Sequence, residues 1–130
     1  MRAFPFALTL CLLASPAFAD LNTFRAQHGR PALSTSASLS SLAYQQAQSM
    51  ASRTRIDHKD FRARIGNIGS THAENVSMND CADESCAIAQ WARSGRHRAN
   101  MLRGDVSAYG IASATGPNGR KYWALELGGQ

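Results

Sequence analysis

The side chains best suited to chemistry in this sequence lie in three short segments, 56–61, 72–77 and 91–102. The first two carry His58 and Glu74, and the third carries Ser94 and His97. Glu74 stands beside an amide in an otherwise apolar predicted strand. A buried carboxyl group needs a partner, or its pKa rises until the group is neutral. We therefore expect Glu74 either to contact another polar group or to be protonated.

Ser94, His97 and Glu74 are the residue types of a nucleophile, a base and an orienting acid. The sequence around Ser94 lacks both a nucleophile elbow and a Gly-rich oxyanion loop. The expected place of Ser94 at the end of a helix favours a simpler interpretation, in which it is a polar residue at a helix C-terminus. The chain also has no His-Glu-x-x-His motif and no Gly-rich phosphate loop. Glu74, His97 and Ser94 thus remain catalytic candidates without an assigned reaction.

Capping residues, helical spacing and strand alternation predict the elements that must position these residues. The expected helices and helical turns are Leu21–His28, Ser36 or Ser38 to about Arg53, Phe61–Ile65, Asp80 or Asp83 to about Ser94-Gly95, and Arg98–Leu102. The expected strands are Ala73–Met78 and a hairpin of Tyr109–Ala114 and Lys121–Leu127. This order predicts an α+β sandwich with an antiparallel sheet. The large apolar residues of its C-terminal half are expected in one core, namely Trp91, Tyr109, Ile111, Trp123 and Leu125.

The first 19 residues have the pattern of a secretory signal peptide. Met1-Arg2 gives a positive start, an apolar run extends from Phe4 to Leu13, and Ala17-Phe18-Ala19 is a cleavage site. The run is too short to span a bilayer, which needs about 20 residues. We therefore expect a signal peptide over 1–19 and one folded domain over 20–130. The mature protein is expected to be secreted or periplasmic, without a transmembrane segment.

The charge of the chain bears on its partners. Without Arg2, 13 basic residues face nine acidic ones, so the formal net charge falls from +5 to +4. A mildly basic surface favours contact with anionic lipid headgroups or cell-wall polymers. The basic residues are dispersed and have no aromatic residues between them, so we expect no nucleic-acid partner.

Two cysteines remain after the predicted cleavage, Cys81 and Cys86. Export would bring them into an oxidising compartment, where a disulfide between them is favoured over two free thiols. A metal site on these cysteines is less favoured, because no further Cys or nearby His completes a set of ligands.

Seven motifs follow one another over nearly all of the expected mature chain. They are NxxRxxHGxPxL at 22–33, LxxxAxxQAxxMA at 39–51, IDHxDFxxR at 56–64, AENVS at 73–77, WxxSxxHRxNML at 91–102, YGIA at 109–112 and YWALELG at 122–128. In this order they resemble a bacterial-type domain of the cysteine-rich secretory, antigen 5 and pathogenesis-related (CAP) superfamily. The resemblance implies a three-layer α-β-α sandwich with a central antiparallel sheet.

The resemblance also implies a cleft built from two His and two acidic residues. Matched position by position, these are His58, Glu74 and His97, while the second acidic position falls on Ser94. Two His and one carboxylate can take Zn²⁺ with water completing the sphere, but they make a weaker site than a set with two carboxylates. Alternatively, the three side chains hydrogen-bond one another and only organise the fold.

Two functions from different classes are compatible with such a cleft. The first is an exported, non-catalytic binding or effector domain whose ligand is a divalent metal, a lipid, a cell-envelope component or a protein. The second is a metal-assisted hydrolase or peptidase in which Glu74 is the general base. The second acid, missing at Ser94, counts against the hydrolase.

Overall fold

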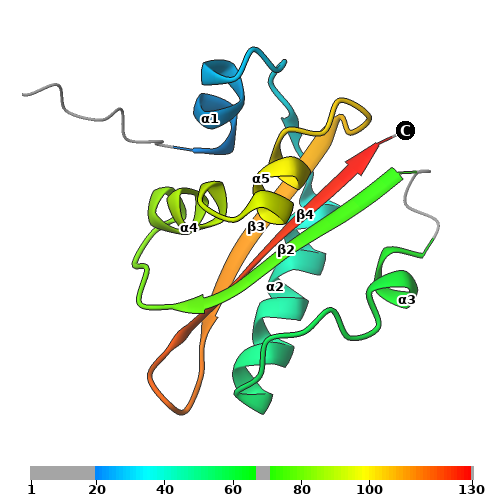
Figure 1. Cartoon of the computed structure of the whole chain (residues 1–130). Helices are drawn as coiled ribbons and strands as arrows, with labels where there is room; N and C mark the ends of the chain where they lie inside the picture. The colour runs from blue at the N-terminus through cyan, green and yellow to red at the C-terminus, as the bar shows by residue number, and fades with distance from the viewer. Residues whose placement is uncertain (1–19, 67–70, 130) are drawn as a thin grey trace, which may run out of the picture.

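The computed structural model describes residues 20–66 and 71–129 (Figure 1). The predicted signal peptide, 1–19, lies outside the described residues. The chain folds into helices and strands in the order α1 (Leu21–Gln27), β1 (Ser34–Thr35), α2 (Ala37–Arg53), α3 (Phe61–Ile65), β2 (Thr71–Asn79), α4 (Glu84–Ala92), α5 (Gly95–Met101), β3 (Ala108–Thr115) and β4 (Lys121–Gly129).

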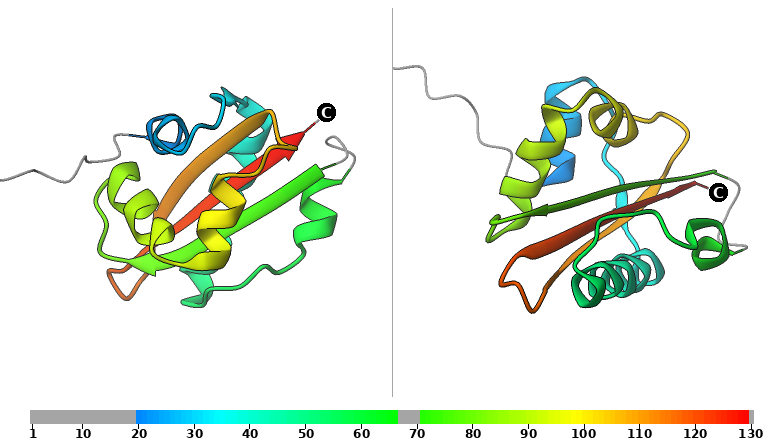
Figure 2. Two further views of the ribbon diagram at one scale, coloured as in Figure 1. Left: turned by 45° about the horizontal axis from the view of Figure 1, so that its top comes forward. Right: turned by 60° about the horizontal axis from the view of Figure 1, so that its bottom comes forward.

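A four-stranded sheet with the order β1-β3-β4-β2 forms the middle layer. Strand β4 pairs antiparallel with both β2 and β3, and β1 adds a two-residue parallel pair to β3. Helix α2 covers one face of the sheet, with α3 beside it, and α1, α4 and α5 lie on the other face (Figure 2). The three-layer α-β-α sandwich expected from the sequence is confirmed.

Local capping explains where the longer helices begin. Asp20 accepts a hydrogen bond from the Thr23 amide at 2.7 Å, and Ser36 accepts one from the Leu39 amide at 3.2 Å. Asp83 caps α4 in the same way. Each side chain satisfies a backbone donor that has no partner inside its helix. The predictions of α1, α2 and the turn at Phe61–Ile65 are confirmed to within a residue or two.

The apolar side chains form two clusters, one on each face of the sheet. The cluster under α1, α4 and α5 contains all five residues predicted to share a core, with Trp91 only 1% exposed and Ile111 partly buried at its margin. The second cluster lies under α2 and includes Ala43, Ala47 and Tyr122. Because β4 contributes to both clusters, its side chains are buried on both faces, as expected for a central strand.

The structure differs from the sequence-based expectation around Ser94. Helix α4 ends at Ala92, and Ser94 is the N-cap of the next helix, α5. Ser94 is therefore not at a helix C-terminus, as the sequence suggested, and its side chain makes no capping hydrogen bond. The turn predicted over Arg98–Leu102 is the second half of α5. Strand β1 was not predicted, because two residues carry no detectable alternation.

Cys81 and Cys86 form the predicted disulfide at the start of α4. On the same side of the sheet, the buried Arg25 connects α1 to the end of α5. Its Nη1 donates to the carbonyls of Met101 at 2.8 Å and Arg103 at 2.9 Å. Within the described ranges, no helix is long and apolar enough to cross a membrane.

Helix α2 sits directly on β3 at Gly110. A Cβ added to Gly110 would come within 2.1 Å of the Ser40 amide nitrogen and 2.3 Å of the Leu39 carbonyl carbon. Both are backbone atoms of α2, so no side-chain rotation could relieve the overlap. The closeness of this layer to the sheet therefore depends on the absence of a side chain at Gly110.

We expect Gly110→Ala to destabilise the protein severely, by more than the cost of about 1–3 kcal/mol that is typical of core overpacking, because the backbone of α2 must move. Gly95→Ala is the matched control, since a Cβ there meets nothing within 4 Å. Chemical denaturation of both variants measures the difference. Equal stability of the two would contradict the close approach of α2 to β3.

Candidate functional site

The centre of the site is a pair of glutamates that face each other across two strands. Glu74 of β2 is the register partner of Glu126 of β4. The two carboxyl groups are 1% and 0% exposed. Two carboxylates this close in a buried place cannot both be ionised without a large cost. The pair must therefore hold a proton, a cation, or both.

Arg64, one residue before the end of α3, supplies the cation. Its Nη2 lies 2.8 Å from Glu74 Oε2, and its Nη1 donates to Glu126 Oε1 at 3.0 Å. The guanidinium is itself only 14% exposed. One positive charge thus bridges two carboxyl groups, and it balances the charge of only one of them.

The directions of the two pKa shifts assign this proton to Glu126. Burial raises the pKa of Glu126 to about 9, and the neighbouring Glu74 raises it as well. Burial also acts to raise the pKa of Glu74, but hydrogen bonds from Glu126, Arg64 and His58 outweigh it, and the pKa is lowered overall. Glu126 Oε2 is buried and accepts no hydrogen bond from any described residue. A proton on Glu126 can therefore be donated to Glu74, which leaves one carboxylate opposite one guanidinium.

His58 reaches this pair from the connector between α2 and α3. Its Nδ1 lies 2.6 Å from Glu74 Oε1, and the imidazole is 55% exposed. An Nδ1–H that donates to Glu74 leaves Nε2 as the free acceptor nitrogen. Glu74 thus fixes both the orientation and the tautomer of an accessible imidazole. Carboxylates that do not touch the metal act on metal-binding histidines in the same way, by accepting a hydrogen bond from the other ring nitrogen.

The residue before His58 anchors the connector. The buried Gln46 of α2 donates to the Asp57 carbonyl at 2.6 Å. Arg53 donates to both oxygens of the Asp57 carboxylate, at 2.6 and 3.0 Å. Hydrogen bonding from Arg53 lowers the pKa of Asp57 to about 2, so the clamp persists across the physiological pH range. His58 is therefore presented by a fixed segment of backbone.

His97 comes from the other layer, in α5. Asn75 of β2 donates to the His97 carbonyl at 2.9 Å, and Asn100 donates to Asn75 Oδ1 at 2.9 Å. These amides fasten α5 to β2. Burial lowers the pKa of His97, and electrostatic interaction with His58 lowers it further. His97 is thus neutral at neutral pH, and the two imidazoles are close enough to interact electrostatically.

The structure brings three of the four predicted residues into one region. His58 contacts Glu74, and His97 lies within electrostatic range of His58. Ser94 sits one helical turn before His97, and within the ranges described its hydroxyl makes no hydrogen bond to Glu74 or His97. In that part of the chain, no three His, Cys, Asp or Glu side chains form a ready set of metal ligands. The zinc site of His58, Glu74 and His97 stays a prediction.

Sequence reasoning missed two residues of the site, Glu126 and Arg64. Arg64 belonged to a motif, but nothing in the motif indicated its partners. Glu126 lies in the run Tyr122–Leu127, in which apolar residues occupy both faces of the strand. A lone carboxyl group in such a run is a signal of burial, and a buried carboxyl group needs a partner. That signal could have identified Glu126 but not Glu74 as its partner.

Comparison with known proteins assigns the family. Residues 18–127 match the family described as CAP, the cysteine-rich secretory protein family. The chain belongs to the CAP family. No curated protein sequence matches this CAP domain significantly.

Solved structures share the fold of this CAP domain. An outer surface protein from Borrelia burgdorferi has a TM-score of 0.74 at 14% identity, over 85% of this chain and 86% of that protein. An extracellular protein containing an SCP domain from Bacillus anthracis has a TM-score of 0.67 at 20% identity, over 85% of this chain. A cysteine-rich secretory protein from Staphylococcus aureus has a TM-score of 0.66 at 20% identity, over 82% of this chain.

The lengths of these proteins differ. The CAP domain described here spans 38% of the Bacillus anthracis chain and 35% of the Staphylococcus aureus chain. The same fold is thus found as one part of larger proteins. At identities of 14% and 20%, the likeness establishes the fold alone.

The proton on Glu126 makes a testable prediction about stability. Its pKa is about 9 in the folded protein and 4.5 when the group is free in water, as in an unfolded chain, so the folded state binds one proton more between these values. This contribution is full below pH 4.5 and is lost as the pH rises toward 9, by up to about 1.4 kcal/mol per pH unit. Glu126→Gln cannot titrate but can still donate to Glu74. We expect the free energy of unfolding to fall less between pH 6 and pH 9 in this variant than in the native chain.

Asp105→Asn is the control for this experiment. Asp105 is an exposed carboxylate whose pKa is lowered by hydrogen bonding to Arg103, so it stays ionised between pH 6 and pH 9. Urea denaturation at both pH values should give the same pH dependence for Asp105→Asn and the native chain. An identical slope in Glu126→Gln would mean that Glu126 is ionised in the folded protein.

Proposed function

We propose that this CAP domain is an exported, non-catalytic binding module whose cleft holds a divalent metal through His58 and His97. The contact between His58 Nδ1 and Glu74 Oε1, at 2.6 Å, carries the proposal. It leaves Nε2 of an accessible ring free. Neutral imidazole nitrogens are good ligands for Zn²⁺, and the lowered pKa of His97 keeps the second ring in that state.

In this arrangement Glu74 supports the metal site through His58 rather than by direct contact. Both oxygens of Glu74 already have polar neighbours: Oε1 lies next to His58, and Oε2 lies next to Arg64. Two imidazoles leave the other positions of a tetrahedral Zn²⁺ to water or to an anionic group of a ligand. A phosphate or carboxylate of a lipid or cell-envelope molecule has the chemistry to fill such a position.

The same contacts favour binding over hydrolysis. A general base must accept a proton from an attacking water. Glu74 is 1% exposed, its pKa is lowered, and its oxygens are engaged by a histidine and an arginine. These features leave it a poor candidate for that role. Ser94, the candidate nucleophile, contacts neither of its supposed partners among the described residues.

Export of the domain is supported by the sequence pattern over 1–19 and by the names of proteins with the same fold. One is an outer surface protein, one is an extracellular protein, and one is a cysteine-rich secretory protein. The disulfide between Cys81 and Cys86 accords with an oxidising compartment.

Calorimetric titration with Zn²⁺ tests the metal site. We expect the native chain to bind one Zn²⁺ at pH 7.5, and His58→Ala and His97→Ala to lose this binding. His28→Ala is the control, because His28 is the exposed C-cap residue of α1 and contacts the Phe24 carbonyl. Affinity should fall on acidification, since the imidazoles must be neutral to bind. Undiminished binding in His58→Ala or His97→Ala would place the metal elsewhere.

The position of Ser94 gives a gain-of-function test. A carboxylate there would stand at the N-terminus of α5, one turn from His97, where the helix dipole also favours negative charge. We expect Ser94→Glu to raise the Zn²⁺ affinity about tenfold or more. Groups that support metal ligands typically change the metal affinity on this scale. Ser94→Gln has the same size without the charge and should show no such gain. Binding by Ser94→Glu but not by the native chain would show that the native cleft does not hold the metal.

A further inference from the structure

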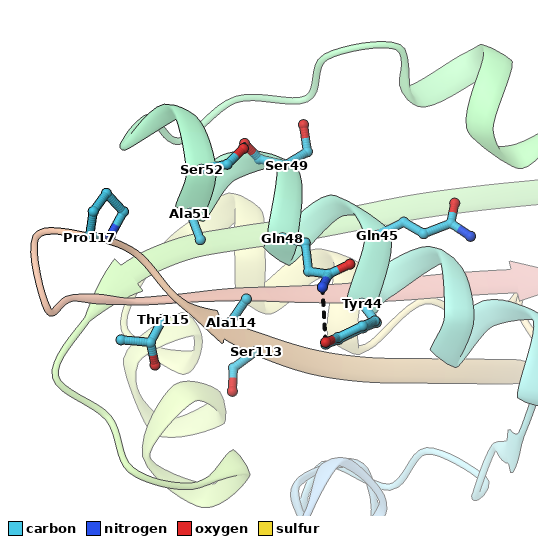
Figure 3. Close-up of a pocket in the computed structure, with 10 residues that line it drawn as sticks. All are labelled: Tyr44, Gln45, Gln48, Ser49, Ala51, Ser52, Ser113, Ala114, Thr115 and Pro117. Atoms are coloured by element: carbon cyan, nitrogen blue, oxygen red, sulfur yellow. Dashed lines mark hydrogen bonds between the residues drawn. The ribbon is translucent and has the colours of Figure 1, made fainter.

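Strand β3 has an outer edge that is paired over only part of its length. It pairs with β4 from Ala108 to Thr115, but with β1 only at Ala108 and Tyr109. The remaining edge, which we call the β3 edge, consists of residues 111–115. It lies at the border of the sheet next to α2 (Figures 1 and 3).

The hydrogen bonds to β1 determine which backbone groups point outward along this edge. Ser34 donates to the Ser107 carbonyl at 3.0 Å, and Ser36 donates to the Tyr109 carbonyl at 2.9 Å. Because strand residues alternate, the N–H and C=O groups of Ile111, Ser113 and Thr115 also point away from β4. In the described ranges these groups have no backbone partner.

The side chains of the β3 edge do not protect it. Natural sheets guard an exposed edge with charged residues, proline or a bulge. The sequence here is Ile-Ala-Ser-Ala-Thr, which contains neither charge nor proline, and its register with β4 is continuous. The unpaired N–H and C=O groups along such an edge can form backbone hydrogen bonds with another extended strand.

A groove beside the edge leaves room for such a strand. It has a volume of about 670 Å³ and lies between α2 and the end of β3. Its wall on α2 includes Tyr44, which is 49% exposed, and Gln48, whose amide donates to the Tyr44 hydroxyl at 2.9 Å. Ala114 points toward α2 from the opposite wall (Figure 3). Helix α2 touches β3 closely at Gly110, so the groove opens only along the half of the strand that lacks a partner.

We propose that the β3 edge pairs with the same edge of a second copy of this chain, as two antiparallel strands related by a twofold axis at Ser113. In this register Ser113 faces Ser113 of the other copy and exchanges two backbone hydrogen bonds with it. Ala112 faces Ala114 on the side of α2, and Ile111 faces Thr115 on the other side. Every opposed pair is uncharged. The side chains of Ala112 and Ala114 of each copy lie on the side of α2, where they enter the groove beside Tyr44 of the other copy. The result is one continuous eight-stranded sheet, and this inference is independent of the metal site.

Proline at position 113 tests the proposal without breaking the sheet inside one copy. The Ser113 N–H points away from β4, so Ser113→Pro removes only the outward donor, and an edge position of this kind tolerates proline. Ser113→Ala removes the hydroxyl and keeps the N–H. Sedimentation equilibrium should show a concentration-dependent dimer for the native chain and for Ser113→Ala. We expect the dimer dissociation constant of Ser113→Pro to rise at least about tenfold, because both central hydrogen bonds are lost.

A second variant guards against a folding defect in Ser113→Pro. Thr115→Lys places a charge on the exposed end of the edge, and Thr115→Ser is its neutral control. The lysine variant should also weaken the dimer, while at a concentration at which both variants are monomeric its thermal midpoint equals that of the control. A chain that is monomeric throughout the concentration range overturns the proposal. So does a dimer whose dissociation constant is the same in the native chain, Ser113→Pro and Thr115→Lys, because another surface would then hold it.

Discussion

Two carboxyl groups are held against each other in the interior by the pairing of β2 with β4, and the site is built around this constraint. Glu74 and Glu126 cannot move apart without breaking the register. Ser36 donates to the Tyr109 carbonyl, so the backbone groups of Tyr109 point away from β4 and those of the next residue, Gly110, point toward its register partner Glu126. Glu74 and Glu126 are therefore a non-hydrogen-bonded pair of β2 and β4, the kind of pair whose side chains lie closer together. A guanidinium and a proton together balance them. Glu74 is thereby held as a fixed carboxylate between Arg64 and His58, and it orients the His58 ring.

The two imidazoles come from opposite layers of the sandwich. His58 depends on the clamp of Asp57 by α2, whereas His97 depends on amide contacts between α5 and β2. Strand β2 separates the layers, and its residues serve both sides: Glu74 faces α3, and Asn75 faces α5. The relative position of the two rings therefore depends on how the layers pack, and α2 packs closely on the sheet at Gly110.

Much of the fold could be predicted from local chemistry, because caps such as Asp20 and Ser36 and the periodicity of α2 act within a few residues. The family motifs predicted that His58, Glu74 and His97 approach one another. The charge partners could not be predicted, because the meeting of Glu74 with Glu126 depends on which strands are neighbours and in what register. The helix boundary near Ser94 was also predicted wrongly. Only two residues separate α4 from α5, and the spacing of apolar residues does not reveal so short a break between helices.

The strand order also sets a sequence of events in folding. Strands β3 and β4 are joined by a short turn and can pair early, whereas β2 precedes α4, α5 and β3 and must join the far side of β4. Pairing between distant segments is the slow step in such topologies. Glu74 therefore loses its water only when β2 docks onto β4, and this docking is the slow step. Changes in the carboxyl pair should therefore act on the rate of folding as well as on the rate of unfolding. The speed at which the chain folds is thus linked to the same carboxyl group that contacts His58.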